Sequence, residues 1–302
     1  MISTGSSVVA EASRLGPVAV MDSGIGGLPY LDEARRLLPF VPFVYLADRE
    51  GFPYGTKSRE AVEAIVIDRV RRLVVSWRPR AIVIACNTAS QAALAAVRTD
   101  NPDVPIIGTV PAIKPAAERT RSGVIGILAT ERTIRDPYLD DLVASFAAER
   151  RVLRVGAQDL VEFVERRLAS STAEERRAAV LPSVRLLVEG GADEIVLACT
   201  HFLHIAGDIA DCARELLAGL GGAGAARRIE VVDSREGVAR RLRQVLADEG
   251  GLGQEGAALQ MSSLLLSGSE PFEADYEVYA RRYCLDGPLP LDRRPPSGPG
   301  LR

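Results

Sequence analysis

Two of the four cysteines stand where predicted strands end. Cys86 follows the apolar run 81–85, and Cys199 follows the similar run 195–198. A helix or loop begins directly after each cysteine, and the unpaired N–H groups at a helix N-terminus stabilise a thiolate. A single free cysteine is most often a buried, inert side chain. Two at matched positions in two similar halves of the chain are better explained as a pair of reactive thiols.

Two further residues can activate these thiols, whose ordinary pKa of roughly 8.5 leaves them mostly protonated at neutral pH. Asp22 ends a neighbouring predicted strand, and His201 follows Cys199 by two residues. The remaining cysteines are interpreted as structural, because Cys212 lies within a helical pattern and Cys284 lies near the C-terminal tail.

The composition excludes several classes of protein. The 302 residues include only two histidines and two lysines, and their formal charge is −3. Two lysines offer few candidates for a pyridoxal Schiff base, and a near-neutral charge predicts no nucleic-acid partner. The longest uncharged run, 81–97, contains too many polar side chains to span a membrane. Four widely spaced cysteines without a signal peptide favour a cytoplasmic protein over a disulfide scaffold.

A cluster of glycines at 24–27 follows the first predicted strand and opens a helix. Asp48 stands 22 residues after Gly26, as the ribose-binding acid of a dinucleotide site would. However, Pro29 occupies the third glycine position of that fingerprint. We therefore favour an anion-binding turn, in which Ser23 and glycine N–H groups hold a carboxylate.

A zinc site is the other alternative that the residue types raise. Cys199, His201 and His204 lie close together in the sequence. Their spacing matches none of the usual structural zinc patterns. We predict no metal site, and we interpret His204 as a helix residue.

Short apolar runs alternate with longer amphipathic stretches, which is typical of parallel α/β sheets. Strands are expected at 18–21, 43–47, 81–85, 106–109, 123–129, 151–155, 195–198, 229–232 and 264–266. Helices are expected at 28–38, 58–76, 88–98, 133–146, 159–168, 172–189, 235–246 and 271–283. The run 82–88 resembles 195–201, and we infer two α/β domains of similar topology. Ligands of such sheets bind at the C-terminal ends of the strands.

Several motifs, taken in order, resemble those of the cofactor-independent glutamate racemases, within the aspartate/glutamate racemase superfamily. The resemblance runs from about residue 17 to 285. Its motifs are V-M-D-S-G-I-G-G-L at 20–28, P-Y-G-T-K-S at 53–58, A-C-N-T-A-S at 85–90, G-T-V-P-A-I-K-P-A at 108–116, A-C-T-H at 198–201 and D-S at 233–234. Each motif alone is weak, and together they are specific.

The resemblance implies two parallel-sheet α/β domains related by a pseudo-twofold axis, with the active site in the cleft between them. The first domain would comprise residues 16–112 and 228–286, and the second 113–227. From composition, 1–15 is expected to be a disordered lead-in and 287–302 a disordered tail. The resemblance also implies a homodimer that needs no cofactor or metal, acts on glutamate and supplies D-glutamate for peptidoglycan.

The resemblance further implies roles for individual residues. Cys86 and Cys199 would be the two acid/base residues, assisted by Asp22 and His201. The substrate would be held by Ser23, Tyr54, Gly55, Asn87, Thr88, Thr133 and Thr200. Elementary chemistry agrees with two thiols, because racemisation removes a proton from one face of the α-carbon and returns one to the other.

The sequence departs from the family in three places near the expected cleft. Phe202-Leu203 replaces an aromatic–proline pair, 48–52 replaces a more usual run, and 156–159 lacks the usual Cys-Pro. Side-chain specificity is therefore less firmly predicted than reaction type. A racemase for aspartate or another small carboxylate remains an alternative. So does a non-catalytic binding protein on the same scaffold, because fold does not fix function.

Overall fold

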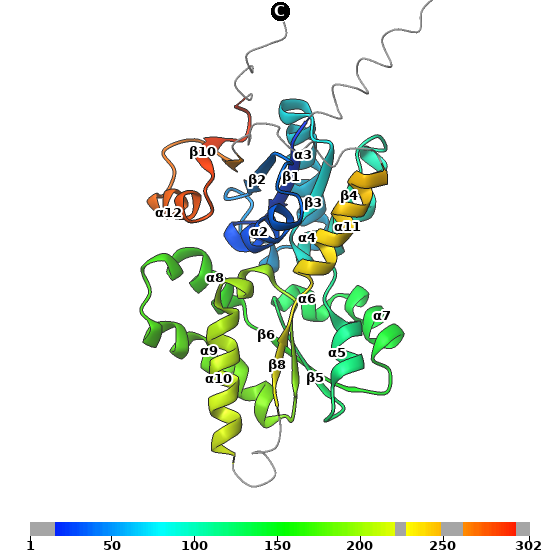
Figure 1. The fold of residues 1–302 in the computed structure, drawn as a ribbon, viewed down its shortest axis with the longest axis vertical. Coiled ribbons are helices and arrows are strands. Elements are labelled where there is room, and N and C mark those ends of the chain that lie inside the picture. The colour runs from blue at the N-terminus through cyan, green and yellow to red at the C-terminus, as the bar shows by residue number, and fades with distance from the viewer. Residues whose placement is uncertain (1–15, 221–227, 249–261, 294–302) are drawn as a thin grey trace, which may run out of the picture.

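A computed structural model describes residues 16–220, 228–248 and 262–293. They form two α/β units, each built on one parallel sheet, drawn one above the other in Figure 1. The two-domain α/β expectation is thus confirmed. The predicted lead-in at 1–15 lies outside the described residues, as does most of the predicted tail.

The first unit contains a six-stranded sheet in the order β10-β9-β2-β1-β3-β4, and its paired strands are all parallel. Its strands are β1 Val18–Asp22, β2 Phe43–Ala47, β3 Ala81–Ile84, β4 Ile106–Gly108, β9 Ser263–Leu266 and β10 Asp286–Pro290. The residues of β1, β2 and β3 are all buried. Continuous apolar runs of this kind form parallel strands that helices cover on both faces.

The second unit contains a four-stranded parallel sheet in the order β6-β5-β7-β8. Its strands are β5 Val124–Ala129, β6 Arg151–Gly156, β7 Glu194–Leu197 and β8 Glu230–Val232. The central strands β5 and β7 are almost entirely buried, whereas the edge strand β6 is not.

Helices connect the strands in the alternating order expected from the sequence. The α-helices are α2 Leu28–Leu37, α3 Arg59–Trp77, α4 Asn87–Asp100, α5 Ile113–Arg119, α6 Glu131–Arg135, α7 Pro137–Phe146, α8 Gln158–Arg166, α9 Ala173–Glu189, α10 Ala206–Gly219, α11 Arg235–Asp248 and α12 Ala274–Arg282. The 3₁₀ helices are η1 Ile25–Gly27, η2 Tyr54–Thr56, η3 Leu168–Ser170 and η4 Thr200–Ile205. Among the helices of the described part of the chain, none combines the length and apolar character needed to cross a membrane.

One predicted boundary between the domains and the predicted start of the C-terminal tail are wrong. The strand β8 pairs with β7 in the second sheet, so the chain does not return to the first unit at residue 228. It returns after Val232, where α11 packs against α2. The predicted tail also begins too early, because β10 covers 286–290 and pairs with β9.

One predicted helix is divided. The expected helix 133–146 is interrupted at Asp136, whose backbone is extended (φ −77°, ψ 130°). The cause is Pro137, because a proline disfavours helical geometry in the residue before it. The Asp136 carboxylate accepts a hydrogen bond from the Tyr138 N–H at 3.1 Å and so caps the new helix α7.

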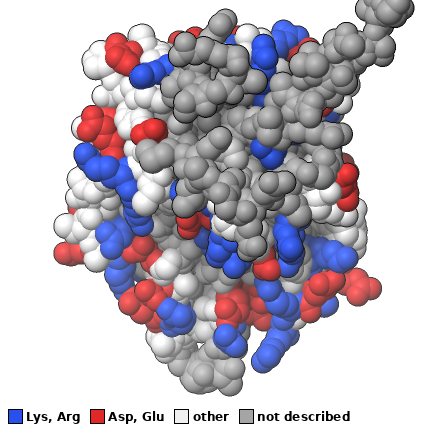
Figure 2. Space-filling view, turned by 45° about the horizontal axis from the view of Figure 1, so that its top comes forward, with Lys and Arg blue, Asp and Glu red and all other residues white. Residues whose placement is uncertain are grey.

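Charged side chains of both signs are interspersed on the face drawn in Figure 2. This distribution agrees with the small net charge of −3. Many of the arginines form ion pairs with nearby carboxylates, such as Arg71 with Asp100 and Arg154 with Asp140, at 2.6 Å each.

Candidate active site

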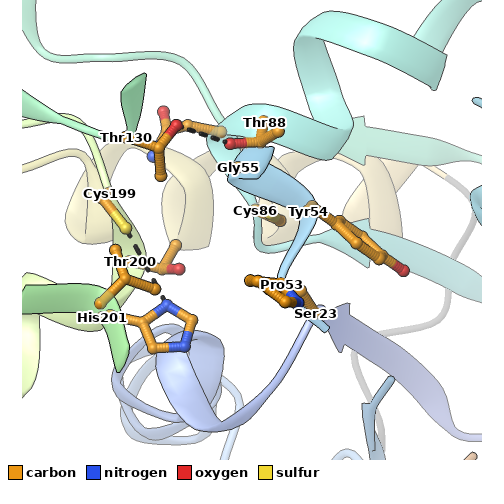
Figure 3. A pocket seen from close by; sticks show the side chains of 12 residues that line it. Ser23, Pro53, Tyr54, Gly55, Cys86, Thr88, Thr130, Cys199, Thr200 and His201 are labelled. Atoms are coloured by element: carbon orange, nitrogen blue, oxygen red, sulfur yellow. Dashed lines mark hydrogen bonds between the residues drawn. The ribbon is translucent and has the colours of Figure 1, made fainter. Parts of the chain in front are cut away.

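A small pocket lies where the C-terminal ends of the two sheets meet (Figure 3). Each unit contributes residues that directly follow its strands: Ser23 after β1, Thr130 after β5, and Cys199 soon after β7. The pocket is lined by Ser23, Pro53, Tyr54, Gly55, Cys86, Asn87, Thr88, Thr130, Val161, Cys199, Thr200 and His201. Nine of the eleven residues that the resemblance assigned to the site are in this lining. The other two, Asp22 and Thr133, form hydrogen bonds with the lining residues Thr200 and Thr88.

On the first unit, Cys86 precedes α4 and is 5% exposed. Burial, reinforced by the negative charge of Asp22, raises the pKa of the Cys86 thiol well above its ordinary value. Asp22 is fully buried and accepts hydrogen bonds from the Ser23 N–H at 2.6 Å and the Thr200 hydroxyl at 2.8 Å. Cys86 therefore carries its proton at neutral pH.

On the second unit, Cys199 lies beside His201, whose Nδ1 is 3.9 Å from the sulfur. Burial disfavours a charged ring, but hydrogen bonds with Cys199 and Glu165 outweigh it and hold the pKa of His201 well above its ordinary value. The imidazolium stabilises negative charge on the adjacent sulfur. The two cysteines thus have different surroundings: Cys86 lies beside the buried carboxyl group of Asp22, whose own pKa burial raises, and Cys199 lies beside an imidazolium.

Glu165, on α8, is a site residue that the sequence analysis missed. Its Oε2 is 3.0 Å from His201 Nε2 and accepts the Ile25 N–H at 2.9 Å, while its Oε1 accepts the Tyr276 hydroxyl at 2.9 Å. Burial alone would raise the pKa of Glu165, but these hydrogen bonds outweigh it and hold the pKa below its ordinary value. The sequence did contain one sign of it: Glu165 stands four residues after Val161, which places a charged side chain on the buried face of an amphipathic helix.

Hydroxyl and amide groups occupy another side of the pocket. The Oγ1 of Thr88 is 3.2 Å from that of Thr130 and 3.2 Å from that of Thr133. Thr130 was also missed as a site residue. Both amide atoms of Asn87 are buried, and neither has a hydrogen-bond partner among the described residues. Because buried polar groups are normally satisfied, Asn87 has hydrogen-bonding capacity for a ligand.

The glycine turn differs from its prediction. It does hold a carboxylate, but the carboxylate belongs to Glu165, which accepts the Ile25 N–H. The Gly27 N–H donates to the Tyr45 hydroxyl at 2.9 Å, so it is also engaged within the protein. The close packing explains the glycines, since a Cβ at Gly24 would lie 2.3 Å from Glu165.

Tyr54 lines the pocket, but its hydroxyl points away from the pocket. That hydroxyl donates to Asp48 Oδ2 at 2.7 Å, and Arg69 Nε donates to Asp48 Oδ1 at 2.7 Å. Asp48 is fully buried in this network. The ribose-binding role weighed for Asp48 is therefore wrong, and its contacts fix the loop that carries Tyr54 and Gly55 to the pocket.

His204 does not approach Cys199 as a second ligand would. Its Nε2 donates to the Ile25 carbonyl at 2.9 Å, and its ring packs against Tyr279 and Tyr283. Within the described ranges, no group of three His, Cys, Asp or Glu side chains is placed to hold a metal ion.

Burial of His204 predicts a pH-dependent stability. Burial lowers the pKa of this ring from 6.5 to about 4. The unfolded chain therefore binds a proton more readily, and folding stability falls as the pH drops from 6.5 towards 4. The loss is about 3 kcal/mol when the shift is complete. His204→Gln, which retains a donor for the Ile25 carbonyl, should remove this component. Urea unfolding of both proteins at pH 7.5 and pH 4 measures how much stability each loses between these two values. An equal loss in the two proteins would contradict the assignment to His204.

Comparison with known proteins places the chain in a family. The model of the Asp/Glu/hydantoin racemase family matches residues 29–240. The glutamate racemase of Sphingopyxis alaskensis is 49% identical over 228 residues, which cover 75% of this chain and 80% of the relative. That of Brucella ovis is 39% identical over 232 residues, covering 76% and 79%.

Solved structures agree with the fold. The structure of Escherichia coli glutamate racemase in complex with L-glutamate and the activator UDP-MurNAc-ala has a TM-score of 0.71 and 32% identity. It covers 89% of this chain and 95% of that one. Glutamate racemase RacE1 of Bacillus anthracis has a TM-score of 0.73 and 26% identity, covering 92% and 99%.

Two parallel α/β units that each bring a cysteine to one shared pocket define the class of protein. The match to the family model extends over more than half of the chain, and relatives above 30% identity cover three quarters of it. The chain belongs to the Asp/Glu/hydantoin racemase family and is an amino-acid racemase.

Proposed function

We propose that this protein interconverts L- and D-glutamate with two thiols and no cofactor. The observation that carries the proposal is the pair of cysteines from the two units at one pocket, with the Asp22 carboxyl group beside one and the His201 imidazolium beside the other. The choice of glutamate is supported by the relatives at 39% and 49% identity, both named as glutamate racemases.

The proposed reaction follows from the charge asymmetry. The Cys199 sulfur, as a thiolate stabilised by the His201 imidazolium, accepts the α-proton from one face of the substrate. The electron pair of the broken C–H bond remains on a planar carbanion, and the Cys86 thiol donates its proton to the opposite face. The reverse reaction exchanges the roles of the two sulfurs, so no oxidant or reductant is needed.

The intermediate must be stabilised, because the α-proton is very weakly acidic. Preorganised donors that face the substrate lower the barrier most when water is excluded. Asn87, with its unpartnered amide, and the hydroxyls of Ser23, Thr88 and Thr200 are the candidate donors. The pocket is enclosed between the units, so substrate entry requires them to separate.

We further propose that the protein acts as a cytoplasmic homodimer and that its D-glutamate serves peptidoglycan synthesis. The support is the family resemblance in the motifs that surround Cys86 and Cys199.

Incubation of the pure protein with L-glutamate in heavy water tests the proposal. We expect the optical rotation to fall towards zero while the α-position gains deuterium, without added metal or pyridoxal phosphate. Aspartate and close analogues serve as competing substrates. Preference for one of these would overturn the choice of glutamate, and exchange with none of them would favour the non-catalytic alternative.

A further inference from the structure

Glu165 receives its hydrogen bonds from both units. His201 belongs to the second unit, as does Glu165 itself, whereas the Ile25 N–H and the Tyr276 hydroxyl come from the first. In Figure 1, α12, which carries Tyr276, is part of the upper unit, and α8, which carries Glu165, is at the top of the lower one. Two of the three donors to this carboxylate therefore cross between the units.

Tyr276 is a buried residue of the first unit. Its side chain is buried, and its helix lies in the chain between β9 and β10 of the first sheet. At the start of that helix, Glu273 pairs with Arg49 at 2.9 Å. Burial raises the pKa of Tyr276 far above its ordinary value, so the hydroxyl stays protonated and donates to Glu165.

The contact matters because Glu165 is the counter-ion of His201. A buried carboxylate stays ionised only while enough donors surround it. If Tyr276 loses its hydroxyl, one oxygen of Glu165 loses its hydrogen bond in a buried place. Ionisation of the carboxylate then becomes less favourable. Glu165 consequently stabilises the protonated His201 ring less, and it fixes the orientation of that ring less firmly.

We propose that Tyr276 is a positioning residue for the His201–Cys199 pair, acting from the opposite unit through Glu165. Tyr276 itself is not among the residues that line the pocket. The inference rests on the proposed two-thiol reaction for its kinetic consequence, but not for its effect on His201. The first unit thereby controls, across the interface, the charge beside the cysteine of the second.

Other charged and titratable groups face these residues and stay in place when only the hydroxyl is removed. They are Asp22, Tyr45, Arg49, Cys199, His204, Glu273, Tyr279 and Arg282. A change in His201 after that single deletion is therefore assigned to the lost hydrogen bond.

Tyr276→Phe is the test, and Tyr279→Phe is the matched control. Both residues lie on α12 and are buried, but the Tyr279 hydroxyl has no hydrogen-bond partner among the described residues. Because the sequence contains only two histidines, imidazole NMR of the untagged protein resolves His201 once His204→Gln identifies the other ring.

In the parent and in Tyr279→Phe, we expect the His201 ring to stay protonated to the highest pH that the fold tolerates. In Tyr276→Phe it should lose its proton at least about one pH unit lower, the equivalent of one hydrogen bond to a charged group. The kcat for glutamate should fall about tenfold with little change in KM.

Identical His201 titration in the two phenylalanine variants would overturn the inference, whatever the activity. An altered titration in a protein that racemises no acidic amino acid would keep the Tyr276–Glu165–His201 connection and overturn the proposed function instead. A drop in kcat without a change in the His201 titration would also overturn the inference about Tyr276, since the effect on catalysis would then not pass through the His201 ring.

Discussion

Replacing either Cys86 or Cys199 with serine is expected to lower kcat for racemisation by about a thousandfold or more. A serine hydroxyl is far less acidic than a thiol, so it neither accepts the α-proton as an anion nor donates it readily. In the proposed reaction each face of the substrate needs its own acid/base group, so neither cysteine should be able to replace the other. Polarimetry started separately from L- and D-glutamate measures the loss, and Cys284→Ser, at an exposed site away from the pocket, is the control.

The two serine variants should also differ from each other. The thiol that remains, in its deprotonated form, can still remove a proton from its own face and return one from solvent. Each variant should therefore exchange the α-proton of one enantiomer for deuterium with retention of configuration, and the favoured enantiomer should be opposite in the two. Near-full turnover in both directions by either variant would show that the two-base assignment is wrong.

The positions of the two cysteines could be predicted because they depend on local sequence and on one rule of topology. An apolar run that ends in Ala-Cys identifies a strand end, and parallel sheets place such ends along one edge. The internal similarity of 82–88 and 195–201 showed that this happens twice. The same reasoning placed Asp22 and Ser23 at the C-terminal end of the first strand.

Glu165 could not be predicted in the same way, because its role depends on contacts that no local pattern encodes. Its partners His201 and Tyr276 lie 36 and 111 residues away in the sequence. Thr130 was missed for a related reason: it directly follows the predicted strand 123–129, but its hydroxyl contacts Thr88 of the other unit, 42 residues earlier. Contacts between units depend on how the two sheets meet, which periodicity does not describe.

The misassigned strand β8 has a similar origin. A short run such as 230–232 fits either sheet equally well, and the resemblance suggested a return to the first domain at 228. Its pairing is decided by β7, whose exposed edge would otherwise lack hydrogen bonds. The chain therefore forms β8 at the edge of the second sheet first and then returns to the first unit with α11.

Gly26→Ala is expected to inactivate the protein while leaving it folded. A Cβ at this position would lie 2.5 Å from His201 Nδ1, 2.6 Å from Thr200 Oγ1 and 2.7 Å from Asp22 Oδ2. All three atoms belong to buried side chains that hydrogen bonds hold in place. The new methyl group must displace at least one of them, at the point where the environments of both cysteines meet.

The expected effect is a fall in kcat/KM of roughly a hundredfold, the usual consequence of moving catalytic groups by about an ångström. Gly237→Ala is the matched control, because nothing lies within 4 Å of a Cβ at that helical position. It should keep full activity and gain slightly in stability, since alanine favours a helix over glycine. Circular dichroism and thermal unfolding establish that both variants fold. A folded Gly26→Ala protein with parental kcat/KM would mean that the Asp22–Thr200–His201 cluster tolerates displacement, and that racemisation does not depend on the charges it sets beside the two thiols.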